Sequence, residues 1–239
     1  MRIASPNHDG RRTGVDMLVL HYTGMPDAAS ALSRLTDPRS QVSSHYLVDL
    51  EGTVFALVAE GRRAWHAGVS SWKGETDLNS RSIGIEIDHP GHEGGNPQFA
   101  KTQIEAVIGL CRDILSRWPI PAARVLAHSD IAPRRKQDPG ERFPWELLHR
   151  AGIGHYVEPD PIEAGPALGL GDDGAGVEEL QSLLFEYGYA VEATGSFGEQ
   201  TRSVVTAFQR HFRQERVDGR ADASTLATLR KLNSALTPP

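Results

Sequence analysis

The chain has 239 residues, of which 39% are hydrophobic, so it can bury the core of one large domain or of two smaller ones. Its formal net charge of −6 shows no basic surface of the kind that binds nucleic acids non-specifically. No run of about 18 apolar residues occurs, and the N-terminal MRIASPNHDGRR lacks the apolar core of a secretory signal, so we expect neither a membrane span nor export.

Apolar segments that are typical of buried strands lie along the first 130 residues. The pattern is clearest over 81–88, where Ile83, Ile85 and Ile87 alternate with Glu86 and place that carboxylate on the opposite face. The other strands are predicted over 15–22, in a hairpin over 43–58 that turns at Glu51-Gly52, and over 125–128.

One long segment of this part has helical spacing. Apolar residues recur along 100–118, which predicts a helix that ends before Pro119. Cys111 lies on the apolar stripe and is the single cysteine, so it is predicted to be a buried structural thiol. A loop to Pro144 and a short helix over 145–150 follow, whereas 59–80 has no period and is predicted to be a surface loop. Strands mixed with helices indicate an α/β or α+β fold.

A change of composition marks a second region. Residues 152–173 are rich in Gly, Pro, Asp and Ala, which indicates a linker or the edge of a new domain. Three helices are then predicted over 177–187, 201–212 and 224–232. Their apolar residues can share one small core, which is workable for a domain of about 70 residues.

Polar residues follow two of the predicted strands and suggest a metal site. His21 ends one apolar strand and His128 another, and Asp138 lies ten positions after His128. Two imidazoles and one carboxylate form a known catalytic zinc set that leaves the fourth position free. Because the chain has one cysteine, such a site must use histidine and carboxylate ligands.

Five motifs together resemble the N-acetylmuramoyl-L-alanine amidase type 2 family, which includes the AmpD-like enzymes and is related to peptidoglycan recognition proteins. They are HYTG at 21–24, SSHYLVD at 43–49, WHAG at 65–68, IGIEID at 83–88 and HSDIAPRRKQDPGERFPW at 128–145. The resemblance covers roughly residues 10–150. It implies a central mixed β-sheet flanked by helices, one zinc ion per chain, and cleavage of the amide between N-acetylmuramic acid, or its anhydro form, and L-alanine.

The resemblance also implies roles for single residues. The zinc ligands map onto His21, His128 and Asp138, and the catalytic residues map onto Glu86 and Lys136. The family's usual stretch is closer to HSDIAPGRKTDPG, and this chain departs from it at Arg134, Gln137 and Glu141. These departures spare the ligands and the lysine, but they leave the loop shape and the substrate preference open.

The chemistry of amide hydrolysis agrees with these roles. Water is a weak nucleophile at neutral pH, and bound zinc activates it and polarises the carbonyl. Glu86 is positioned to take the proton of the water and return it to the leaving amine. The resemblance implies that Lys136 stabilises the oxyanion of the tetrahedral intermediate.

Four further side chains near the motifs are candidate substrate-binding residues, and each has a structural alternative. They are Tyr22, His45, Trp65 and His66. His89 and His92 are not predicted to be metal ligands. Their spacing would need a helix, which Pro90 and the neighbouring glycines oppose.

The C-terminal segment resembles the three-helix peptidoglycan-binding domain. The matching stretches are GDDGAGVEELQSLLFEYGY at 171–189, TGSFGEQTRSVVTAFQRHF at 194–212 and VDGRADASTLATL at 217–229. The resemblance implies that this part holds the enzyme on wall polymer. We therefore predict a catalytic domain at 1–155, a linker at 156–170 and a peptidoglycan-binding domain at 171–239.

Two other functions remain open from the sequence. One is an inert peptidoglycan sensor with the same fold, and the other is a zinc peptidase that cuts within the stem peptide. The expected partner is peptidoglycan or an anhydro-muropeptide, and nucleic acid is not expected. We expect a monomer in the cytoplasm, with the periplasm or the cell envelope as the alternative.

Overall fold

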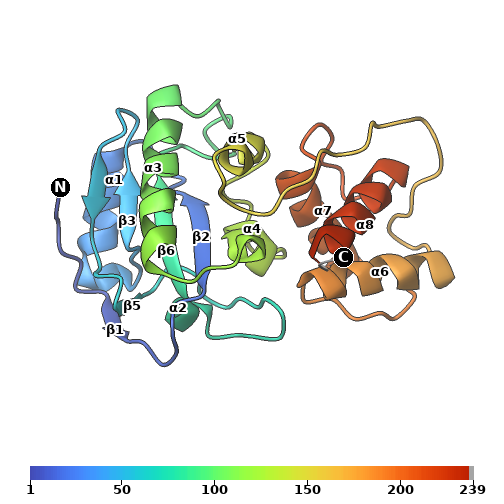
Figure 1. Ribbon diagram of the computed structural model, residues 1–239, viewed down its shortest axis with the longest axis horizontal. Helices are drawn as coiled ribbons and strands as arrows, with labels where there is room; N and C mark the ends of the chain where they lie inside the picture. Colours follow the sequence, from blue (N-terminus) through green and yellow to red (C-terminus); the bar gives the residue numbers. More distant parts are fainter. Residues whose placement is uncertain (237–239) are drawn as a thin grey trace.

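A five-stranded mixed sheet forms the centre of the N-terminal part of the computed structural model, which describes residues 1–236 (Figure 1). The strand order is β4-β3-β6-β2-β7. The strands are β2 (Met17–Tyr22), β3 (Tyr46–Val48), β4 (Val54–Ala56), β6 (Ser82–Ile87) and β7 (Val125–Ala127). Only β4 runs antiparallel to its neighbour, so the prediction of a mixed central sheet is confirmed.

One face of the sheet packs on the long helix α3 (Lys101–Arg117). Leu18 and Leu20 of β2 and the three isoleucines of β6 point to this face, as their alternation predicts. α3 lies close to its predicted bounds and contributes the fully buried Cys111. Burial raises the pKa of the Cys111 thiol to about 12, which agrees with a structural thiol and excludes a thiolate nucleophile there.

The opposite face of the sheet carries His21 and Glu86 and is covered partly by a helix that the sequence analysis missed. Helix α1 (Ala28–Thr36) packs Ala31 and Leu35 against Leu47 of β3. Asp27 caps it by accepting a hydrogen bond from the Ser30 amide at 2.7 Å. A short 3-10 turn at Pro38–Ser40 follows.

The prediction that 59–80 is a surface loop was wrong. The segment contains β5 (Arg62–Ala64), which pairs with β1 (His8–Gly10), and the short helix α2 (Leu78–Arg81). Trp72 has no exposed surface, because it packs edge to face against Tyr187 and Tyr189 of the C-terminal part. A segment buried by a distant part of the chain needs no periodicity of its own.

The region after β7 also differs from its prediction. A 3-10 turn at Ala122–Arg124 leads into β7, and the strand ends at Ala127. His128 is therefore the first residue of a short helix, α4 (His128–Ile131), and not the last residue of a strand. Helix α5 (Trp145–Arg150) begins after Pro144, as expected.

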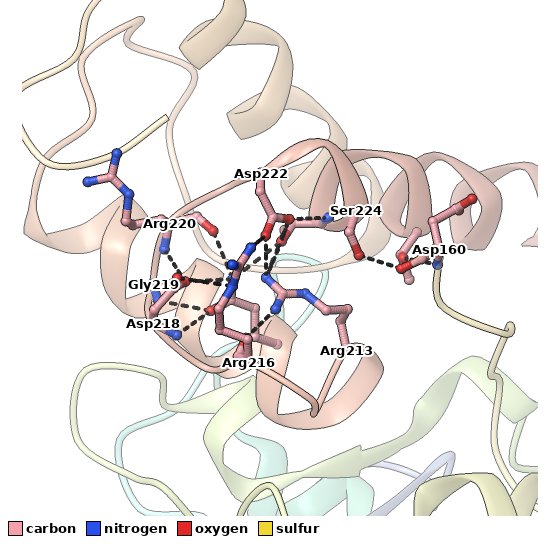
Figure 2. A network of polar contacts seen from close by, with 11 residues as sticks. Asp160, Arg213, Arg216, Asp218, Gly219, Arg220, Asp222 and Ser224 are labelled. Carbon is pink, nitrogen blue, oxygen red and sulfur yellow. Dashed lines mark hydrogen bonds and ion pairs between the residues drawn. The ribbon is translucent and has the colours of Figure 1, made fainter. Parts of the chain in front are cut away.

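Three helices form the C-terminal part, as the apolar spacing predicts. They are α6 (Ala175–Tyr187), α7 (Glu199–Phe212) and α8 (Ala223–Leu236). Figure 2 shows Arg213 and Arg216 converging on Asp222 between α7 and α8. Arg213 also donates to Thr225 at 2.7 Å, so the buried end of α7 is fixed to the start of α8.

The apolar core of this part continues into the sheet domain. Phe208 and Leu184 belong to the same buried cluster as Val19 and Leu126 of the sheet and Trp72. Figure 1 shows α7 and α6 on the side of α4, away from the N-terminus. Among residues 1–236, no helix combines the length and the apolar character needed to cross a bilayer.

Candidate active site

The candidate site lies at the C-terminal ends of three neighbouring parallel strands. His21 at the end of β2 pairs in register with Glu86 of β6, and His128 directly follows β7 on the other side of β2. A cavity of ≈ 400 Å³ opens over these ends. The sheet therefore brings together residues that are far apart in the sequence, at the edge where parallel strands usually hold ligands.

Three buried side chains meet beneath this cavity, and two of them, His128 and Asp138, line it. Nδ1 of His21 lies 2.9 Å from Nδ1 of His128 and 3.1 Å from Oδ2 of Asp138. Nδ1 of His128 lies 2.9 Å from the same carboxylate oxygen. Within residues 1–236, this is the one group of histidine, cysteine and acidic side chains that could hold a metal ion.

The remaining contacts of His128 fix its tautomer. Its Nε2 lies 3.2 Å from the carbonyl oxygen of Ala67, which can only accept a hydrogen bond. Nε2 therefore carries the proton, and Nδ1 presents a lone pair to Asp138 and His21. A lone pair that faces a carboxylate is repulsive unless a cation lies between them.

A chain of hydrogen bonds fixes His21 in the same way. Ser82 Oγ donates to the carbonyl of Leu78 at 2.5 Å, so it accepts from Nε2 of His66 at 3.2 Å. His66 then accepts at Nδ1 from Nε2 of His21, 3.0 Å away. The Nδ1 atom of His21 is left with a lone pair, directed at the other two ligand atoms.

The donor set fits a metal ion. Burial, and next the charge of His128, lower the pKa of His21 to about 4, so its ring is a neutral ligand at neutral pH. Burial alone would raise the pKa of Asp138, but the neighbouring His128 and His21 outweigh it and lower that pKa. Ligands at zinc distances in a tetrahedron lie about 3.4 Å apart, close to the separations seen here.

Glu86 stands beside this group with one unsatisfied atom. Its Oε2 is buried and has no hydrogen-bond partner. Burial, followed by the charge of Asp138, raises the pKa of Glu86 well above its ordinary value. A carboxyl group that lines the cavity with an unsatisfied oxygen and a raised pKa is suited to exchange protons with a bound water.

Most of the other predicted site residues also line the cavity. Lys136, Tyr22 and Trp65 form parts of its wall, and His66 lies between the wall and His21. Tyr22 donates its hydroxyl proton to Nδ1 of His92, which holds the ring at the rim.

His45 lies behind the cavity wall, so its predicted contact with substrate gains no support from the structure. His45 has no exposed surface, and the cavity lining does not include it. Its Nδ1 accepts from the amide of Gly84 at 3.0 Å, and its Nε2 lies 2.9 Å from Arg11. Its neutral ring holds β6 against the N-terminal segment, and burial lowers its pKa to about 3. His89 is buried and stacked on Phe99, whereas His92 lines the cavity without being a metal ligand.

Two parts of the site were missed. Helix α1 supplies Arg34 and Leu35 to the cavity wall, and the Asp27 cap before an Ala-rich apolar pattern was the available signal. Asn79 holds the WHAG segment by accepting from the amides of His66 and Ala67 at 3.0 and 2.8 Å. No local pattern marks such a contact.

This fold, with a His-His-Asp group that could hold one metal ion over the ends of its parallel strands, defines a hydrolase of the amidase type. The model of the N-acetylmuramoyl-L-alanine amidase family matches residues 10–141, and that of a putative peptidoglycan binding domain matches 173–229. The chain belongs to the N-acetylmuramoyl-L-alanine amidase family, and it is an amidase of this type.

Several known proteins are similar over most of the chain. The amidase AmiD of Escherichia coli K12 is 43% identical over 228 residues, which cover 89% of this chain and 80% of that protein. The anhydro-amidase AmpD of Haemophilus influenzae is 34% identical and covers 61% of this chain, with 88% of its own length matched.

Solved structures agree with the sequence matches. E. coli AmiD in complex with anhydro-N-acetylmuramic acid-L-Ala-D-gamma-Glu-L-Lys superposes with a TM-score of 0.79, 39% identity and coverage of 97% of this chain and 90% of that chain. AmpDh3 of Pseudomonas aeruginosa in complex with an anhydromuramic pentapeptide superposes with a TM-score of 0.81 and 35% identity. The match covers 100% of this chain and 97% of that chain. The likeness therefore includes the C-terminal helices.

Proposed function

We propose that this amidase uses zinc held by His21, His128 and Asp138, and that it cleaves the bond between anhydro-N-acetylmuramic acid and L-alanine of soluble muropeptides. The observation that carries the metal proposal is the convergence of the lone pairs of His21, His128 and Asp138. The contact with Ala67 sets the tautomer of His128, and the contact with His66 sets that of His21. A nitrogen and oxygen donor set without thiolates suits zinc in a catalytic site, with a fourth position for water or substrate. When bound, zinc makes water a nucleophile near neutral pH and polarises the carbonyl.

The residues of the chain supply the remaining steps. Glu86, with its raised pKa and free Oε2, takes the proton of the attacking water and delivers it to the leaving amine of L-alanine. Lys136 donates to the developing negative charge on the amide oxygen. Tyr22 and Trp65 offer aromatic surface at the cavity wall for the sugar or the stem peptide.

Similarity supports the substrate. Two relatives that match over nearly the whole chain were solved with anhydromuramic peptides, and AmpD is named for the anhydro sugar. A cavity of ≈ 400 Å³ has room for an anhydro sugar and the first residue of a peptide.

Mass analysis of a digested anhydro-muropeptide, with zinc quantified in the same preparation, tests the proposal. We expect release of a free stem peptide that begins with L-alanine, about one zinc ion per chain, and loss of both in His21→Ala. Cleavage that leaves L-alanine on the sugar would identify a stem-peptide peptidase. Folded protein that binds the muropeptide without metal and without cleavage would identify a sensor.

A further inference from the structure

A buried carboxylate on α4 joins the zinc-ligand helix to the C-terminal helices. Asp130 has no exposed surface. Its Oδ1 accepts from the Tyr189 hydroxyl at 2.7 Å, and its Oδ2 accepts from Nδ1 of His211 at 2.7 Å and from the amide of Ala127 at 2.8 Å. Two of its three donors therefore come from the part of the chain that resembles a peptidoglycan-binding domain.

The position of Asp130 matters because of what lies beside it. It belongs to the same helical turn as His128, and its bond to Ala127 closes the corner between β7 and α4. The amide of Ser129 donates to the carbonyl of Asp138 at 3.0 Å. The backbone of one metal ligand is thus fixed to that of another inside the turn that Asp130 holds.

Helix α7 and the residues after it also hold the other end of the ligand segment. Arg210 donates to Gln137 at 3.1 Å and lies 3.6 Å from Glu141, and these residues flank Asp138. Gln214 donates at 2.8 Å to the carbonyls of both Glu141 and Phe143. The segment that carries two of the three metal ligands is therefore held at both ends by the C-terminal helices.

These contacts come from a fixed support. The His211 ring stacks on Trp145 of α5 at 3.7 Å between centroids, and Figure 1 shows α7 facing α4 and α5. On the other side of α7, Gln209 and Arg213 are bound within their own domain, and Figure 2 shows how Arg213 is held by Asp222. A rigid element that holds ligand-bearing residues can set their geometry to within a fraction of an ångström.

We propose that Tyr189 and His211 are positioning residues for the metal ligand His128, acting through Asp130, so that the C-terminal helices form part of the metal site in addition to any contact with wall polymer. The shared apolar cluster around Trp72 is sufficient to dock the two domains, so docking alone does not require the buried polar contacts of Asp130. Burial of a carboxylate is costly unless donors satisfy it, and a fully satisfied buried network fixes one geometry. The proposal rests on the proposed metal site.

The test compares zinc affinity in full-length variants, measured by competition with a chromophoric chelator, together with kcat, KM and the melting temperature. Tyr189→Phe removes one hydroxyl, and His211→Ala removes the second donor. His211→Asn keeps an N–H near the place of Nδ1. Arg230→Gln, which breaks an exposed ion pair with Glu179 within the C-terminal helices, is the matched control.

We expect Tyr189→Phe and His211→Ala to weaken zinc binding about 10- to 100-fold, as loss of outer partners of metal ligands does. Their kcat should fall with little change in KM, and His211→Asn should recover most of both losses. Arg230→Gln should match the wild type.

Wild-type zinc affinity and kcat in Tyr189→Phe and His211→Ala, with only a lower melting temperature, would overturn the proposal. If His211→Ala does not fold, Tyr189→Phe decides alone. Tight zinc binding by a wild-type protein without amidase activity would refute the proposed function instead, because the affinity comparison does not depend on turnover.

Discussion

Gly84 tests whether the His66 ring orients the metal ligand His21. A β-carbon built at Gly84 would lie 2.6 Å from ring atoms of His66, whereas ordinary contacts begin at 3.4 Å. In Gly84→Ala the ring must therefore move by about 0.8 Å, the difference between these two distances. Its bond to His21 is 3.0 Å long, so a shift of this size can carry it beyond hydrogen-bonding range.

The cost follows from two contributions. Overpacking of a filled interior typically costs about 1–3 kcal/mol. Loss of a buried hydrogen bond adds roughly 1 kcal/mol, so the free energy of unfolding of the metal-free protein should fall by about 2–4 kcal/mol. Zinc affinity should also fall, by about 10- to 100-fold, since His21 loses the partner that fixes its tautomer.

Urea unfolding of the metal-free protein and chelator competition measure the two effects separately. Gly10→Ala is the matched control, because Gly10 also lies in a strand but has nothing within 4 Å of an added β-carbon. It should change stability by less than about 0.5 kcal/mol. If Gly84→Ala kept both wild-type stability and wild-type zinc affinity, the assignment of His66 as the orienting partner of His21 would be refuted.

Three further predictions concern the chemistry and the stability of the site. Glu86→Gln should lower kcat by about 10²- to 10⁴-fold with zinc content and KM nearly unchanged, as measured by steady-state kinetics and metal analysis. A folded Glu86→Gln protein with wild-type kcat would mean that Glu86 only supports the fold. Removal of the metal by a chelator should abolish activity and lower the melting temperature, and returning zinc should restore both. Free zinc at 100 times its dissociation constant should raise the free energy of unfolding by about 2.7 kcal/mol. The hydrogen bond from His92 lowers the pKa of Glu141 to about 2, so its stabilising effect should be complete above the unfolded value near 4.5 and lost as the pH falls toward 2. In metal-free protein, Glu141→Gln should therefore show a flatter melting-temperature profile than the wild type between these pH values, and parallel profiles would contradict this.

The parts of the fold that local pattern decides could be predicted. The isoleucines of β6 alternate over a buried sheet, so their period placed Glu86 on the other face, where the structure has it. The stripe of α3 and the three C-terminal helices were likewise found, because each buries one continuous apolar face. The compartment, by contrast, stays a prediction.

The parts that distant contacts decide could not be predicted. Trp72 is buried by tyrosines more than 100 positions later, so its segment resembled a surface loop. His45 and His66 are both histidines beside aromatic residues in family motifs, and only the three-dimensional packing separates them. His66 contacts a metal ligand, whereas His45 bonds to Gly84 and Arg11 behind it.

Contacts between the two parts of the chain also explain sequence features that were unexplained within the catalytic part alone. Gln137 departs from the usual family stretch, Glu141 follows directly after that stretch, and both contact Arg210 of α7. Arg134 also departs, and nothing in the structure explains it. A polar side chain beside a metal ligand is retained at low cost when a partner satisfies it. Arg210 lies 73 positions after Gln137 in the sequence, on a helix of the C-terminal part. The ligand loop and α7 therefore constrain each other, and substitutions in one should be tolerated only with matching changes in the other.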